Sequence, residues 1–321
     1  MNILTASRYT MTVTAAVAVL AACSGGESQL TPLTSTQQSS DSRDRGRSWM
    51  SPEAKTKTLL YVSSDAGYVN VYSYPKLALM GTLTGFNSPD GECVDGSGDI
   101  FITDQGASDI LEYAHGGTSP IATLSDPQET PLGCAIDEQG NLAVTNTPGQ
   151  NGSGTNGIAW YKGATGSPTQ IAGGTTLSRV LFDGFDNHGD LFIDGWNPSG
   201  NPQVGMLAVG KNKIKPITLK GATLAYPGGI QGYQHQIIVG DQLNHALYET
   251  TKTGSVTHTV SLQLYGGYYT PVCRQGTVNG STYVCPDADF GAVETFAFPS
   301  GGPATHYLRD IDGPEGTAIS K

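Results

Sequence analysis

A repeated unit constrains the fold more than any other feature of this sequence. One copy runs from Pro89 to Asp104 and a second from Pro131 to Asn146. Both copies begin with Pro-x-Gly, carry Asp-x-x-Gly ahead of an apolar run, and end in an apolar residue, Thr, and Asp or Asn. The leading prolines stand at 89, 131, 227, 271 and 314, at intervals of 42, twice 48, 44 and 43 residues. A period of roughly 40–50 residues is typical of the blades of β-propellers.

Each repeat contains signals for four strands. In Asp-x-x-Gly the aspartate can cap backbone N–H groups and the glycine can take a positive φ, which predicts a hairpin turn. The runs Ile100–Ile102 and Leu191–Ile193 are continuously apolar, as expected of strands buried on both faces. Half-exposed third strands follow, such as Val69–Tyr74. The fourth, outer strands are expected at Leu77–Leu83, Pro120–Leu124, Ile214–Leu219, Val256–Leu262 and Ala304–Leu308.

The two ends of the repeat array predict how the ring closes. Gly313–Ile319 has the sequence of a first strand, whereas Thr58–Asp65 has that of a second strand with no first strand before it. Together they complete one composite blade, and closure of the ring removes exposed strand edges. The predicted fold is therefore all-β: a six-bladed β-propeller of four-stranded antiparallel blades over residues 56–321, with seven blades as the alternative. The 43 glycines agree with turn-dense β structure and exclude a helical bundle.

The N-terminal segment predicts export. Arg8 is the only charge before residue 27, and Met11–Ala22 is an uncharged run of 12 residues, mostly apolar. A membrane-spanning helix needs about 20 such residues, so the run is typical of a secretory signal. Leu20-Ala21-Ala22-Cys23 then resembles the lipobox of bacterial lipoproteins. The resemblance implies a signal peptide over residues 1–22, acylation of Cys23, and a lipid anchor in the cell membrane or outer membrane. A plain signal peptide is the alternative.

Residues 23–55 are expected to form a flexible tether, because they are polar and lack apolar periodicity. The four cysteines beyond Cys23 suggest disulfides in an exported domain. Cys273 and Cys285 flank the turn signal Asn279-Gly280, which favours their pairing. Cys93 and Cys134 open the inner strands of consecutive repeats and form the second expected pair. Buried free thiols are the alternative.

The turns of the repeats predict where ligands could bind. In a propeller, the loops after the second strands and the loops leading into the first strands lie on one face. The loops after the second strands begin with Asp65, Asp104, Asn146, Asp194, Asp241 and Asp287, and the loops leading into the first strands supply Asp90, Glu92, Arg274 and Glu315. Such a ring of carboxylates suits Ca²⁺ or another hard divalent cation. Alternatively, each Asp or Asn caps its own turn.

Across roughly residues 56–321 the repeats resemble the six-bladed propellers of NHL-repeat and gluconolactonase-like proteins. The gluconolactonase-like enzymes hold a divalent metal with Glu, Asn and Asp side chains at this face. The resemblance implies Glu315 (or Glu92), Asn146, Asp194 and Asp241 as metal ligands and a lactonase-like hydrolase or lyase activity. The chain lacks the recognisable motifs that flank these residues in the family.

Two loops on the same face are expected to be long, Thr145–Gly157 and Asp194–Val204, and the second carries Trp196 as a candidate recognition residue. The net charge of −11 excludes a general nucleic-acid binder. The sequence therefore favours a membrane-tethered binding module of the cell envelope, with a protein, peptide or glycan ligand. The metal-dependent enzyme is the alternative, and a structural brace between envelope components is a third hypothesis.

Overall fold

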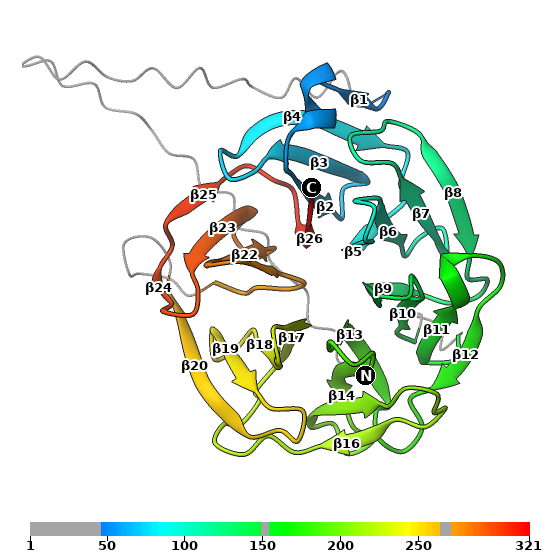
Figure 1. Ribbon diagram of the computed structural model, residues 1–321, viewed down its shortest axis with the longest axis vertical. Coiled ribbons are helices and arrows are strands. Elements are labelled where there is room, and N and C mark those ends of the chain that lie inside the picture. Colours follow the sequence, from blue (N-terminus) through cyan, green and yellow to red (C-terminus); the bar gives the residue numbers. More distant parts are fainter. Residues whose placement is uncertain (1–45, 149–153, 264–270) are drawn as a thin grey trace, which may run out of the picture. The chain divides into compact units, whose positions relative to one another are not determined.

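The computed structural model shows six antiparallel β-sheets arranged as blades of a ring (Figure 1). The structure describes residues 46–148, 154–263 and 271–321. Apart from two short 3₁₀ turns, η1 (Pro52–Thr56) and η2 (Lys162–Ala164), the regular elements of these residues are strands. The predicted all-β, six-bladed propeller is thus confirmed over the seven-bladed alternative. The predicted signal segment (residues 1–22), Cys23 and most of the predicted tether lie outside the described residues.

The strands follow the repeats of the sequence. Blade 1 contains β26 (Pro314–Ser320), β2 (Leu59–Ser64), β3 (Tyr68–Ser73) and β4 (Ala78–Thr84). Blade 2 contains β5 (Pro89–Val94), β6 (Ile100–Asp104), β7 (Asp109–Tyr113) and β8 (Pro120–Ser125). Blade 3 contains β9 (Pro131–Ile136), β10 (Leu142–Asn146), β11 (Gly157–Tyr161) and β12 (Thr169–Ala172).

The remaining blades have the same inner-to-outer order. Blade 4 contains β13 (Arg179–Phe185), β14 (Leu191–Trp196), β15 (Pro202–Leu207) and β16 (Lys215–Ile217). Blade 5 contains β17 (Pro227–Tyr233), β18 (Gln236–Asp241), β19 (Ala246–Thr250) and β20 (Val256–Gln263), with the short β24 (Gly302–Pro303) added parallel to β20. Blade 6 contains β21 (Thr277–Asn279), β22 (Thr282–Asp287), β23 (Ala292–Ala297) and β25 (His306–Leu308).

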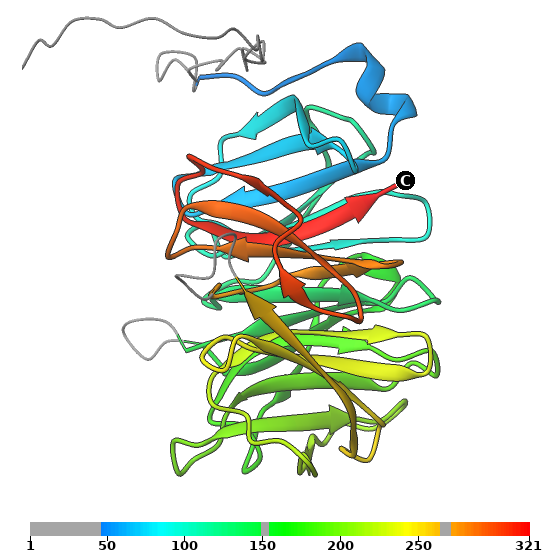
Figure 2. The same ribbon diagram turned by 90° about the vertical axis from the view of Figure 1, so that its left-hand side faces the viewer.

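The ring closes through the composite blade that the sequence predicts. β26 pairs antiparallel with β2, with Leu59 opposite Ser320 and Val62 opposite Thr317. The side view shows the strands running between the two faces of the ring (Figure 2). Because the final strand is the innermost strand of the first blade, the edge of β2 toward the ring axis is paired rather than exposed.

The chain joins the first blade earlier than residue 56, where the propeller was expected to begin. Trp49–Met50 form β1, which pairs with β4, and Met50 packs against the hydrophobic core. Ala54, within η1, is fully buried. Residues 49–55 are therefore part of the first blade and not of a flexible tether. Their apolar side chains are the adjacent pair Trp49-Met50 and Ala54, a segment too short for the periodicity that would reveal an outer strand in the sequence.

The Asp-x-x-Gly segments form the predicted hairpins. Asp95 accepts hydrogen bonds from the backbone N–H groups of Ser97 and Asp99 at 2.8 and 2.9 Å, and Gly98 has a φ of +90°. Asp137 and Asp186 cap their turns in the same way. The aspartates satisfy backbone donors that the turn would leave unpaired, so this repeated motif is a local structural device.

Adjacent blades are joined by a hydroxyl at the end of the second strand. The Thr103 Oγ1 accepts a hydrogen bond from the N–H of Gly91 in its own blade and donates one to the carbonyl oxygen of Leu132 in the next blade, at 2.8 and 2.6 Å. Thr145 makes the same pair of bonds to Gly133 and Leu181. Gly91 permits this approach, because a Cβ there would lie 2.3 Å from the Leu132 oxygen. The Gly and Thr of the repeat thus bring neighbouring inner strands into contact.

The hydrophobic core lies between neighbouring blades. One cluster combines Tyr61 and Val71 of blade 1 with Ile102 of blade 2, and another combines Phe101 of blade 2 with Leu142 of blade 3. Both expected disulfides are present. Cys93–Cys134 links blades 2 and 3 with a Cα–Cα distance of 5.7 Å, and Cys273–Cys285 lies within blade 6 at 5.0 Å.

Candidate functional site

One face of the ring carries the loops that join second to third strands and the loops that lead into the next blade. We call it the loop face, and the opposite one the far face. The Asp104 carboxylate, after a second strand, accepts hydrogen bonds from the N–H groups of Asn87 and Ser88, which lead into β5, at 2.8 and 2.7 Å. These contacts show that the two sets of loops meet, as the sequence predicts.

Several acidic residues of the predicted ring accept hydrogen bonds from loop backbone. Asp241 accepts hydrogen bonds from the N–H groups of Ala225 and Tyr226 and from the Asn244 amide. Asp287 accepts from Asp289 and Phe290, and burial raises its pKa to about 6. Asp287 thus caps its own turn, as in the turn-capping alternative, and Asp104 and Asp241 hold the loop that leads into the first strand of the blade. Asp65 is exposed, and its N–H donates to the carbonyl oxygen of Gly313.

Asn146 lies fully buried beneath the loop face. Its Nδ2 donates to Asp126 Oδ2 at 2.8 Å, and Gln170 donates to the other oxygen of that carboxylate at 3.0 Å. Burial raises the pKa of Asp126. The contact joins the end of β10 to the loop that leads into β9, so Asn146 anchors that loop.

Asp194 does not occupy the same position as the other loop aspartates. Its Oδ1 accepts the N–H of Phe182 at 3.1 Å, where Thr103 and Thr145 accept the N–H of Gly91 and Gly133. It therefore replaces the bridging hydroxyl of blades 2 and 3. Its Oδ2 is buried without a hydrogen-bond partner in the described part of the chain, and burial raises its pKa well above the usual carboxyl range.

Glu315 and Arg274 form an ion pair beside the ring axis, from β26 and the segment before β21. Asp90 lies close enough for its charge to interact with both, and its Oδ2 accepts a hydrogen bond from Gln105 at 2.6 Å. Burial raises the pKa of Asp90 and of Glu315. The Arg274 guanidinium is thus partly neutralised by a carboxylate that the sequence predicted as a metal ligand.

The predicted metal ligands are not brought together. The carboxylates of Glu315, Asp194 and Asp241 do not converge to within 4.8 Å of one another. Glu315 is paired with a cation, and Asp241 is occupied by backbone and amide donors. The carboxylates of Glu315, Asp194 and Asp241 therefore do not form a convergent three-carboxylate group. Within residues 46–148, 154–263 and 271–321, the group of three acidic side chains that does converge is Asp95, Asp99 and Glu112, in blade 2 near its far-face hairpin.

A pocket of about 390 Å³ opens on the loop face over blades 3 to 6. Its apolar lining includes Leu132, Leu181 and Phe182 from the inner strands of blades 3 and 4. The loops around blade 5 add Tyr226 and Leu243, which are 41% and 63% exposed. The polar lining residues are Arg179, Gln242, His245, Arg274 and Asp289. Contrary to the predicted acidic ring, this pocket has two guanidinium groups and one carboxylate.

The cationic and imidazole groups of the pocket are held in place by neighbouring loops. Arg179 is exposed, and its Nε donates to Thr147 Oγ1 at 3.1 Å. His245 Nδ1 lies 2.9 Å from the carbonyl oxygen of Pro271. Since a carbonyl only accepts, Nδ1 carries the proton of the neutral ring and Nε2 is the acceptor.

Trp196 is not on a long loop. It is the last residue of β14, and residues 197–201 alone separate β14 from β15. The Trp196 ring is half-buried and packs edge-on against Tyr226, with ring centroids 5.1 Å apart. It supports Tyr226, which is the more exposed ring. Of the other predicted long loop, Thr145–Gly157, residues 147–156 separate β10 from β11, and residues 149–153 lie outside the described part.

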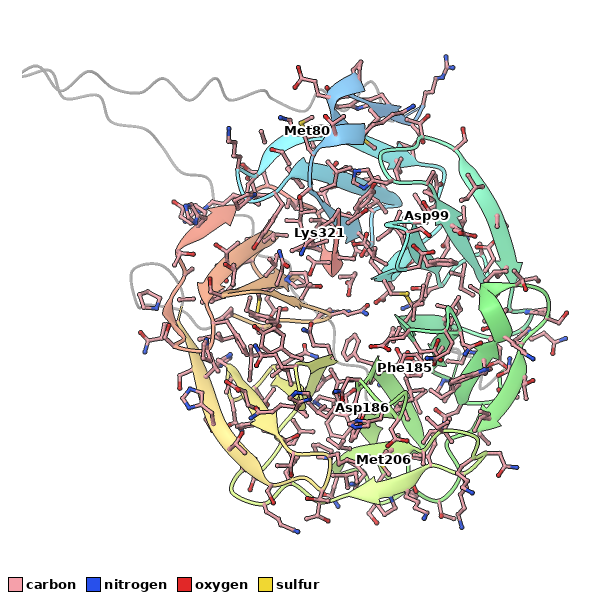
Figure 3. All side chains as sticks on the ribbon, viewed as in Figure 1. Met80, Asp99, Phe185, Asp186, Met206 and Lys321 are labelled. Carbon is pink, nitrogen blue, oxygen red and sulfur yellow. A yellow bond between two sulfur atoms is a disulfide. The ribbon has the colours of Figure 1, made fainter. Side chains whose placement is uncertain are left out.

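The Gln275 side chain spans the ring axis. Its side chain accepts the N–H of Glu92 at 3.1 Å and donates to the carbonyl oxygen of Cys134 at 3.2 Å. A second cavity, of about 270 Å³, lies on the far-face side and is lined by Glu92, Asp183 and Gln275 among others. Phe185, labelled near the axis in Figure 3, also lines it.

Glu92 and Asp183 are buried, and none of their four carboxyl oxygens has a hydrogen-bond partner in the described residues. Burial raises both pKa values well above the usual range, so the neutral carboxylic acid is favoured. Glu92 is therefore not on the loop face, where the sequence placed it.

Arg179, His245, Gln242 and Asp183 were not predicted as site residues. Arg179 is the first residue of the inner strand of blade 4, in a repeat that lacks the leading proline, and this irregularity is the signal that could have identified it. His245 follows an Asp-capped turn like any surface histidine. Its place in the pocket depends on the packing of blade 5 against blade 6. No local sequence motif indicates that packing.

Comparison with known proteins supports the fold. No protein-family model matches the chain, and no curated protein matches it in sequence. A chain in a crystal structure of a nidogen/laminin complex superposes with a TM-score of 0.67 at 14% identity, covering 82% of this chain and 98% of that one. A streptogramin B lyase structure superposes with a TM-score of 0.51 at 16% identity, covering 81% and 75%. At these identities the likeness shows the β-propeller fold and not an activity.

None of the helical segments in the described residues is long and apolar enough to cross a membrane.

Proposed function

We propose that this chain is an exported, lipid-anchored binding module that presents its loop face to a ligand in the bacterial cell envelope. The single observation that carries the binding role is the loop-face pocket of about 390 Å³ with an exposed apolar rim. Ligand sites in proteins are concave, mostly apolar and supplied with a few fixed polar groups, and this pocket has all three properties.

The scaffold favours recognition by a preformed surface. The bridging hydroxyls and the Cys93–Cys134 disulfide join neighbouring blades, and the pairing of β26 with β2 closes the ring within blade 1. Loops on such a rigid frame can bind with little loss of conformational entropy. Tyr226 is further supported by its contact with Trp196.

Two solvent-exposed aliphatic residues allow a matched test of the binding face. Leu243 is 63% exposed on the rim, and Val209, next to the far-face turn at Gly189, is 60% exposed. We expect a photo-reactive amino acid at position 243 to cross-link in cells to one defined partner or ligand, whereas the same amino acid at 209 does not. Equal cross-linking from both positions, or none from 243, contradicts the proposal.

The anchor is supported by Leu20-Ala21-Ala22-Cys23 and the polar stretch that follows. Two or more acyl chains on Cys23 would hold a soluble domain firmly at a bilayer, since each buried CH₂ contributes about 0.8 kcal/mol. Cys23→Ser should move the protein from the detergent phase to the aqueous phase on detergent partition. Continued recovery in the detergent phase would rule out lipidation at this residue.

A further inference from the structure

We propose that the loop-face pocket binds a carboxylate carried on an apolar body, with Arg179 as the principal anchor and Arg274 as the second. This inference rests on the proposed binding function and names the chemical class of its ligand. Two sources share that chemistry: a free small organic acid, and the C-terminal residue of a peptide whose side chain is apolar.

The charge on the pocket wall selects an anion. Arg179 and Arg274 line it, against the single lining carboxylate of Asp289. A guanidinium matches the two oxygens of a carboxylate with two parallel N–H donors. In a chain with a net charge of −11, two arginines in one pocket are a local exception that favours an acidic ligand.

Of the two arginines, Arg179 has the hydrogen-bond donors that can bind a ligand carboxylate. Only its Nε is bonded, to Thr147, so that both Nη groups are without a partner among the described residues. The bond to Thr147 fixes the plane of the guanidinium and leaves the end of the fork for a ligand. Arg274 is instead paired with Glu315, so its share in binding a second anion is smaller.

The remainder of the pocket favours an apolar body. Leu132, Leu181 and Phe182 supply buried apolar surface, and Tyr226 and Leu243 extend it to the rim. The volume of about 390 Å³ exceeds that of a cavity of roughly 150 Å³ that holds a benzene ring. A phenyl or branched aliphatic group with a short chain to the carboxylate therefore fits.

His245 and Gln242 add polar groups on the blade 5 side of the pocket. With Nδ1 bonded to Pro271, His245 Nε2 can accept a hydrogen bond from a ligand N–H. Gln242 donates to the carbonyl oxygen of Pro227, which leaves its side-chain oxygen to accept another. A peptide terminus offers such N–H groups beside its carboxylate, whereas a simple organic acid does not.

The test is calorimetric titration of the purified full-length chain with paired probes. One pair is 4-phenylbutyrate and its methyl ester; the other is a pentapeptide ending in Phe with a free or an amidated C-terminus. We expect each acid to bind at least about tenfold more tightly than its neutral partner. Tighter binding by the free-acid peptide than by 4-phenylbutyrate assigns the peptide source, and the reverse assigns the small acid.

Variants then locate the site. Arg179→Gln should weaken binding of the acids at least about tenfold and leave the neutral probes unchanged. Arg309→Gln is the matched control, because Arg309 is an exposed loop-face arginine stacked on Tyr307, outside the pocket. It should leave all affinities unchanged.

Equal affinities for acid and neutral probes, no binding of either acid, or unchanged binding by Arg179→Gln would overturn the inference. These results are separable from failure of the proposed function. If position 243 still cross-links to one partner while neither acid binds, the ligand class is wrong and the binding face stands. If position 243 also fails to cross-link, both are wrong.

Discussion

The side-chain amide of Gln275 in blade 6 donates a hydrogen bond to the carbonyl oxygen of Cys134 in blade 3, on the opposite side of the ring, at 3.2 Å. The same side chain accepts the N–H of Glu92 in blade 2. One buried glutamine therefore ties three inner strands together across the axis. It also lines the far-face cavity.

Replacement of Gln275 should destabilise the ring. Gln275→Ala would leave the Glu92 N–H and the Cys134 carbonyl buried without their partner, and each such group costs about 1–3 kcal/mol. We expect a loss of about 2 kcal/mol or more in the free energy of unfolding, measured by denaturant titration. Gln139→Ala, at an exposed far-face turn, is the control and should change it by less than about 0.5 kcal/mol. Equal stability of the two variants would show that the crossing contact contributes little.

Because of Asp194, the free energy of unfolding should fall as the pH rises. Burial raises its pKa in the native state, so the native protein keeps a proton that the unfolded chain releases. The stabilisation that this proton contributes is fully present below the usual carboxyl pKa of about 3.9. It is lost as the pH rises through the pKa of Asp194 in the native protein. Asp194→Asn mimics the protonated acid with an amide that does not titrate.

We therefore expect Asp194→Asn to be more stable than the parent protein at pH 8 by about 1–3 kcal/mol, with a smaller difference at pH 5. Asp90, Glu92 and Asp183 also have raised pKa values, so the variant should flatten only part of the pH dependence. Glu138→Gln, at an exposed turn, serves as the control. A variant curve parallel to that of the parent from pH 5 to 8 would exclude a proton on Asp194.

The two disulfides should differ in their effect on stability. Cys93–Cys134 closes a loop with a sequence separation of 41, and Cys273–Cys285 one of 12. In the chain-entropy account the longer loop restricts the unfolded chain more, by about 1 kcal/mol here. The Cys93→Ala/Cys134→Ala variant should accordingly lose more free energy of unfolding than Cys273→Ala/Cys285→Ala. The opposite order would indicate that packing in blade 6 outweighs loop closure.

The fold could be predicted because its signals are local. Pro-x-Gly, Asp-x-x-Gly and the apolar run each specify a turn or a strand within a few residues, and their period counts the blades. The third residue of Pro-x-Gly has a physical role that the repeat alone does not explain: Gly91 lets the next inner strand approach. The closing strand Pro314–Ser320 could be predicted because Thr58–Asp65 lacks a partner in sequence.

The site was predicted less well because it depends on register and on contacts between blades. Asp194 looks like Asp104 in sequence, yet it takes the place of Thr103, one residue earlier in the repeat. Glu92 lies only two residues from Asp90 but lines the far-face cavity, below Gln275. Arg179 contributes to the pocket because blades 3 to 6 surround it together, which is a tertiary property.

Glu315 should regulate binding of an anion at Arg274. Burial raises the pKa of Glu315. The charged groups that interact with it are Arg274, Asp90 and Asp65. As the pH falls through that raised pKa, Glu315 takes up a proton and Arg274 loses its counter-charge, which leaves Arg274 to an ionised ligand carboxylate. Affinity for 4-phenylbutyrate should therefore rise as the pH is lowered from 8 toward the pKa of Glu315. In Glu315→Gln the affinity should already be high at pH 8 and depend less on pH. The difference between the two calorimetric pH profiles isolates Glu315. Weaker binding by Glu315→Gln at pH 8, or parallel profiles, would show that this ion pair does not limit the access of an anion to Arg274.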